Sequence, residues 1–113
     1  MSDLSAEDKK LVTLARATRA RTNAAEGAAV RDADGRTYAG ATVALSSLQV
    51  SAIGVCVAMA VASGAKGLEA AVVLTDADAV SPEDLSALRD IGGEGIVVHR
   101  GDTRGTIAET VSS

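Results

Sequence analysis

A chain of 113 residues of which 47% are hydrophobic is long enough to bury one continuous core, so we expect a single domain over residues 1–113. The net charge of −4 and the single aromatic residue, Tyr38, argue against nucleic-acid binding, because the chain offers neither a basic surface nor a platform for stacking bases. The single cysteine, Cys56, excludes an internal disulfide and fits a reducing compartment.

The chain carries no pattern that predicts export or membrane insertion. Residues 1–8 contain acids where a secretory signal carries Lys or Arg, and no apolar segment follows them. The strongly apolar residues 50–62 are fewer than the ~20 that span a bilayer. We therefore expect a cytoplasmic protein without membrane contact.

The first part of the chain predicts a helix and then a β-hairpin. Ser5 has the features of an N-cap, with Asp8 three residues later, and apolar residues then recur at helical spacing as far as Arg21. Residues 27–31 and 36–43 flank Asp32-Ala33-Asp34-Gly35, whose Asp and Gly residues favour a tight turn.

The second part predicts two helices that alternate with strands. Residues 50–62 alternate as a strand would, but their length favours a helix, whose apolar surface needs cover from the sheet and from a second chain or a packed layer. Residues 70–75 are a continuous apolar strand. Ser81-Pro82-Glu83-Asp84 starts a helix that Gly92-Gly93 ends. Residues 95–100 predict another strand, and residues 101–113 a short, partly frayed end. This order predicts an α/β sandwich.

The hairpin segment Gly27 to Gly40 resembles the small homo-oligomeric cytidine deaminases, in which the matching segment reads V-G-A-A-L-x-x-x-D-G-x-x-Y-x-G. Ser51-Ala52-Ile53 lies where that family has Cys-Ala-Glu, and residues 81–86 lie where it has Ser-Pro-Cys-Gly-x-Cys. The resemblance runs from about Ser5 to Arg100. It implies a three-layer α-β-α sandwich around a mixed sheet of four to five strands, and a homo-oligomer such as a dimer or tetramer.

The chemistry of that family is missing from the corresponding positions. Its deaminases hold zinc with three thiolate or imidazole ligands, and a Glu carries the proton. The resemblance places Ser51, Glu83 and Ser86 at the ligand positions and Ile53 at the Glu position; the family's Asn-x-Glu becomes Thr42-Val43-Ala44, and its stacking Phe becomes Ala24. We therefore expect no catalytic residue, no zinc and no other cofactor. The relic positions of the pocket are Ala24, Thr42, Ala44, Ser51, Ile53, Glu83 and Ser86.

The other chemistry-bearing residues have a structural interpretation. Cys56 lies in an apolar run without a basic neighbour, which predicts a buried structural thiol. We expect His99 to be a surface histidine at a strand end, because no nucleophile motif accompanies it. Turn formation and the helix dipole explain the acids near the end of the central strand, although a hard-metal or amine site there is an alternative; these acids are Asp76, Asp78, Glu83 and Asp84.

Three functions stay open at this point. The leading hypothesis is a non-catalytic pseudoenzyme that serves as a homo-oligomeric binding or scaffold module, with a small polar pocket formed by Thr42, Ser51, Glu83 and Ser86. The first alternative is a cytidine or nucleoside deaminase in which acids near Glu83 replace the thiolates as metal ligands. The second is a regulatory partner of another protein. No residue pattern identifies the small molecule or protein that such a module binds.

Overall fold

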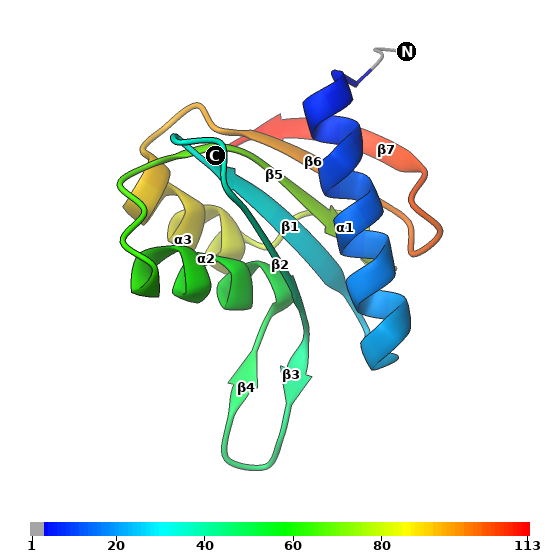
Figure 1. Cartoon of the computed structure of the whole chain (residues 1–113). Helices are drawn as coiled ribbons and strands as arrows, with labels where there is room; N and C mark the ends of the chain where they lie inside the picture. Colours follow the sequence, from blue (N-terminus) through cyan, green and yellow to red (C-terminus); the bar gives the residue numbers. More distant parts are fainter. Residues whose placement is uncertain (1–3) are drawn as a thin grey trace.

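The computed structural model describes residues 4–113, which form a five-stranded mixed sheet in the order β2-β1-β5-β6-β7 (Figure 1). Strands β5 and β6 are parallel, and the other neighbours are antiparallel. A separate two-stranded ribbon, β3 with β4, extends away from the sheet. The strands are β1 (Gly27–Asp32), β2 (Thr37–Ala41), β3 (Val43–Ala44), β4 (Gln49–Val50), β5 (Leu68–Leu74), β6 (Val97–Gly101) and β7 (Ile107–Ser112).

Helices cover both faces of the sheet, which confirms the predicted three-layer α-β-α sandwich. Helix α1 (Ala6–Thr22) packs across β1, β2 and β5 on one face. On the other face, α2 (Ala52–Ala62) packs on β1 and β2, and α3 (Pro82–Gly92) lies beside it against β5 (Figure 1). No helix within residues 4–113 combines the length and the apolar character that a bilayer crossing needs.

Each helix begins at a serine N-cap whose hydroxyl accepts a hydrogen bond from a backbone N–H three residues later. The donor–acceptor distances are 3.1 Å at Ser5, 3.0 Å at Ser51 and 3.1 Å at Ser81. The cap at Ser51 corrects the predicted start of the second helix, because Val50 pairs with Val43 in the ribbon and the helix begins only at Ala52.

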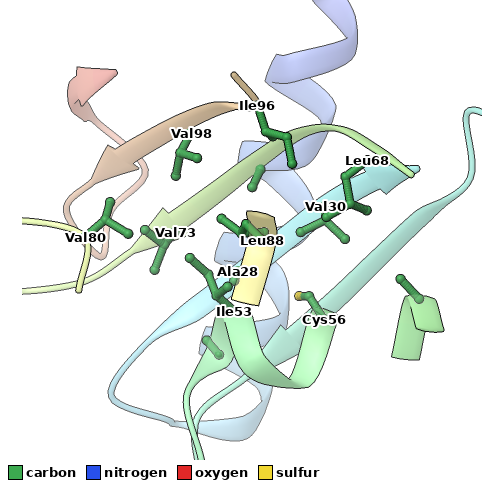
Figure 2. Close-up of a cluster of buried hydrophobic side chains, with 13 residues drawn as sticks. Ala28, Val30, Ile53, Cys56, Leu68, Val73, Val80, Leu88, Ile96 and Val98 are labelled. Carbon is green, nitrogen blue, oxygen red and sulfur yellow. The ribbon is translucent and has the colours of Figure 1, made fainter. Parts of the chain in front are cut away.

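The core consists of small aliphatic side chains on both faces of the sheet. Leu11 and Ala15 of α1 pack with residues of β1 and β5 on one face, and a larger cluster lies under α2 and α3 on the other (Figure 2). Gly40 allows the close approach of α2, since a Cβ there would lie 2.9 Å from Val55 Cγ1 and 3.2 Å from Cys56 Sγ. Close backbone packing thus replaces the aromatic residues that this core lacks.

Three predictions about the last two strands were wrong. Residues 107–112 are not a frayed end but form strand β7, which pairs antiparallel with β6. His99 is not a surface residue, because α1 and β7 cover it and leave only 5% of it exposed. The preceding strand also begins at Val97 rather than at Gly95.

Candidate functional site

A cavity of about 200 Å³ opens where strand β5 ends and helices α2 and α3 begin. Ligands of α/β proteins commonly bind at the carboxyl ends of such strands. Both N-cap serines, Ser51 and Ser81, contribute to its wall, so that the N-termini of two helices meet there. The lining residues are Glu26, Ser51, Val73, Thr75, Ala77, Ala79, Val80, Ser81 and Asp84.

A second, shallower groove of about 330 Å³ borders this cavity and shares Glu26 and Ser51 with it. Its remaining wall comes from the start and end of the β3–β4 ribbon, namely Thr42, Val43, Ala44, Gln49 and Val50. The ribbon therefore flanks the mouth of the cavity.

Glu26 is held from two sides. Thr75 Oγ1 donates a hydrogen bond to Glu26 Oε2 at 2.7 Å and accepts one from the Ala77 N–H at 3.1 Å. The backbone N–H of Glu26 donates to Thr42 Oγ1 at 2.9 Å, and the Thr42 N–H donates to the Glu26 carbonyl at 3.1 Å. These bonds fix both the backbone and the carboxylate of Glu26 at the cavity.

Ser51 and Asp84 connect the first turns of α2 and α3. Ser51 Oγ donates a hydrogen bond to Asp84 Oδ1 at 2.6 Å while it accepts the capping bond from the Gly54 N–H at 3.0 Å. Asp84 is buried, with 9% of its surface exposed. A short bond to an ionised carboxylate at a helix N-terminus is stabilising, because the donor and the helix dipole both favour negative charge there.

The structure brings together some of the residues that the sequence placed in one pocket. Ser51 lines both hollows, and Thr42 and Ala44 line the groove. Glu83 and Ser86 are exposed on α3 and line neither hollow. The residue of α3 that faces Ser51 is instead Asp84, one position after Glu83.

The other relic positions lie in the core or in a loop. Ile53 is fully buried and packs in the cluster that contains Ala28, Val73 and Leu88 (Figure 2). Ala24 is half-buried in the loop between α1 and β1 and lines neither hollow. Of the acids singled out after the central strand, Asp76 and Asp78 are exposed and likewise lie outside the cavity wall.

These residues do not fit the zinc centre that the resemblance implies. The Ser51 hydroxyl is occupied by two hydrogen bonds and is a poor zinc ligand at neutral pH. Within residues 4–113, no group of three or more His, Cys, Asp and Glu side chains is arranged to hold a metal. The prediction that Cys56 is buried is confirmed, and burial raises the pKa of its thiol to about 12, which disfavours the thiolate that zinc needs.

Sequence reasoning missed Glu26 and Thr75 and treated Asp84 only as one of several helix-start acids. One signal was available. Glu26 is an acid directly before a buried strand, where the hairpin pattern of the deaminases has Val. Asp84 lies where their Ser-Pro-Cys-Gly-x-Cys pattern has Gly. An acid in place of an apolar residue directly before a core strand, as at Glu26, indicates a polar environment specific to this chain.

A second polar cluster lies between α1 and the sheet. Asp8 Oδ2 lies 2.8 Å from His99 Nε2, Asp8 Oδ1 accepts from Arg31 Nη1 at 3.0 Å, and Thr110 Oγ1 lies 2.8 Å from His99 Nδ1. Burial by itself raises the pKa of the Asp8 carboxyl, but the hydrogen bonds to His99 and Arg31 more than offset it, so that the pKa lies below its ordinary value. His99 is thus a buried, fully bonded side chain of the core.

Comparisons with known proteins give one family and one fold. A sequence model described as cytidine deaminase-like matches residues 4–105. The structure is similar to that of a cytidine deaminase from Burkholderia pseudomallei, with a TM-score of 0.80 and 20% identity over 96% of this chain and 93% of that one. The cytidine deaminase from Mycobacterium leprae gives a TM-score of 0.73 and 20% identity over 97% and 94% of the two chains. The cytidine deaminase from Mycobacterium tuberculosis gives a TM-score of 0.71 and 20% identity over 83% of this chain and 85% of that one. A search of curated protein sequences gave no match.

Proposed function

Since the chain belongs to the cytidine deaminase-like family, we propose that it is a non-catalytic member, a pseudoenzyme that works in the cytoplasm as a homo-oligomeric binding module. In this proposal the cavity at the end of β5 binds a ligand instead of converting one. Zinc-dependent deamination requires a metal-bound hydroxide and an acid–base group. The positions that the resemblance assigns to these roles hold Ser51, Glu83 and Ser86 as ligands and Ile53 as the acid–base residue.

The observation that carries the proposal is the 2.6 Å hydrogen bond between Ser51 and Asp84. It occupies the space between the first turns of α2 and α3, where the resemblance implies zinc ligands. A bonded serine does not replace a thiolate, and Ile53, in the core at the acid–base position, has no group that takes up or releases a proton.

The exposed apolar surface supports the oligomeric part of the proposal. Residues 37–65 contain no charged side chain, and several of their large apolar residues are open to solvent in the single chain. Leu45 is 61% exposed and Leu48 54% on the β3–β4 ribbon, and Val61 is 57% exposed on α2. Burial of these side chains against a second copy would remove apolar surface from water, which favours association.

A deamination assay tests the catalytic part of this proposal. We expect no conversion of cytidine or deoxycytidine, followed by ultraviolet absorbance with added zinc, beyond that of a blank without protein. Loss of the acid–base group alone typically slows such reactions by ~10²–10⁴-fold, and loss of the metal removes the nucleophile as well. An active cytidine deaminase serves as the positive control. Turnover that depends on zinc and stops when a chelator is added would overturn the proposal.

A further inference from the structure

The wall of the cavity beside β5 contains carboxylates and no cationic side chain. The Arg100 guanidinium contacts the wall only through the Ala77 carbonyl, at 3.1 Å, and pairs with Glu109. Glu26 and Asp84 are the only ionisable residues that line the cavity. Among residues 4–113, neither forms an ion pair, and each has a hydrogen-bond partner at only one carboxylate oxygen: Thr75 at Glu26 Oε2 and Ser51 at Asp84 Oδ1. The second oxygens, Glu26 Oε1 and Asp84 Oδ2, are not among the buried side-chain atoms that lack a partner, so they are accessible and can accept hydrogen bonds from a cationic ligand.

The charge balance of the cavity favours a ligand with one positive charge. The N-termini of α2 and α3 meet at the cavity, and each contributes about +0.5 elementary charge. The carboxylates of Glu26 and Asp84 each contribute a full negative charge, so the sum is about −1. Because the helix ends offset only part of the carboxylate charge, an anion is disfavoured and a monovalent cation is preferred.

The remaining wall favours an organic cation over a metal ion. The three hydroxyl oxygens of Ser51, Thr75 and Ser81 each accept a backbone N–H already. This leaves two carboxylates, whereas Ca²⁺ takes about six to eight oxygen ligands and Mg²⁺ about six in octahedral geometry. The rest of the lining consists of small apolar side chains, and the volume of about 200 Å³ exceeds the room that one ion needs; these apolar residues are Val73, Ala77, Ala79 and Val80.

We propose that this cavity binds the ammonium or guanidinium group of a small organic monocation, with the cationic head between Glu26 and Asp84 and the carbon chain against Val73 and Val80. The inference rests on the proposed binding function and specifies its ligand class. A larger ligand would extend into the neighbouring groove, where the Gln49 side chain offers polar contacts.

Nuclear magnetic resonance titration of the intact protein tests this inference with n-butylammonium chloride as the probe. At constant ionic strength we expect saturable shifts of the backbone amides of residues 75–84, and at least tenfold weaker effects from n-butanol and from magnesium chloride. Glu26→Gln and Asp84→Asn keep the shape of each side chain while they remove one charge, so each should weaken n-butylammonium binding about tenfold or more. Glu83→Gln, next to Asp84 but exposed, is the matched control and should bind like the wild type.

The possible outcomes separate this ligand class from the proposed function. Equal binding of n-butanol, preferential binding of magnesium, unchanged affinity in both carboxylate variants, or no saturable shift in the cavity would each overturn the cation proposal. Circular dichroism of each variant checks that it is folded. If n-butylammonium does not bind and cytidine is not converted, the cation proposal fails but the non-catalytic assignment stands. Zinc-dependent cytidine turnover overturns the non-catalytic assignment whether or not n-butylammonium binds.

Discussion

The carboxylate of Asp8 joins the start of α1 to two strands, through Arg31 on β1 and His99 on β6. Because its pKa is lowered in the folded state, it stabilises the fold above the pKa of the unfolded chain, and this contribution is lost as the pH falls through the folded pKa. We predict that Asp8→Asn lowers the free energy of unfolding by about 1–3 kcal/mol at neutral pH. The difference from wild type should shrink as the pH falls from the ordinary pKa of 3.8 through the lower folded pKa, because the wild-type carboxyl becomes protonated over that range.

Urea denaturation at neutral pH and at a series of pH values below 3.8 measures this effect. Glu7→Gln is a suitable control, because Glu7 is exposed on the same helix turn and forms only an exposed pair with Lys10. Its effect should be within about 0.5 kcal/mol at each pH. A cost for Asp8→Asn that is the same at neutral and acid pH would contradict the assignment.

The Cys56 thiol should be unreactive in the native protein. It is fully buried, and burial raises its pKa to about 12, so that almost no thiolate is present at neutral pH. We expect Ellman's reagent to label it only after denaturation. In the variant Ala17→Cys, at an exposed position of α1, the introduced thiol should react rapidly without denaturant. Equally fast labelling of native wild-type protein would mean that the core around α2 opens readily.

Burial was predictable for Cys56 and not for His99, because the two residues are covered by different parts of the chain. Cys56 has apolar neighbours on both sides in the sequence, which is a local signal. His99 is covered by Asp8, 91 residues away, and by Thr110 on a strand that was not predicted. The pairing of Ser51 with Asp84, 33 residues apart, was hidden for the same reason, although the cap that positions Asp84 was recognised.

Strand β7 is the element that the sequence indicated least clearly. Its half-buried residues alternate with exposed ones, but it is an edge strand with few large apolar side chains, so the alternation is weak. The helices were easier to predict, since Ser5 and Ser81 are local start signals. The two-residue strands β3 and β4 are too short to leave a periodic pattern.

Hydrogen exchange distinguishes strand β7 from a frayed end. The amides of residues 107–112 that bond to β6 should exchange more slowly than those that face solvent, because only the bonded ones require the strand to open. The measurement is two-dimensional nuclear magnetic resonance after transfer to deuterated water. Exchange of all these amides at the rates of an unfolded peptide would contradict the strand.

Helix α2 should provide part of the subunit interface through its outer face. Ala58 is exposed in the single chain, so Ala58→Glu leaves the monomer fold unstrained but places a charge in any apolar contact between copies. We predict a smaller assembly in light scattering, with secondary structure retained by circular dichroism. Ala17→Glu, at an exposed position among the charged residues of α1, is the control and should keep the wild-type assembly. An Ala58→Glu protein that assembles like the control would exclude this face from the interface.

At the scale of the whole molecule, the order of the elements was enough to predict the α/β class, and the hairpin resemblance was enough to predict the layers. The family match over residues 4–105 and the five-stranded mixed sheet agree with both. The composition of the cavity was less predictable, because Glu26, Thr75 and Asp84 come from three separate elements or loops that only the folded chain brings together.

Native mass spectrometry of the protein, produced in zinc-supplemented medium, distinguishes a metal-free homo-oligomer from a zinc enzyme, since one spectrum gives both the number of subunits and the metal per subunit. We predict a dimer or tetramer whose mass equals that of the polypeptide chains alone. A mass that includes one zinc per chain, removable by a chelator, would contradict the claim that this cytidine deaminase-like fold serves as a binding module without the family's metal chemistry.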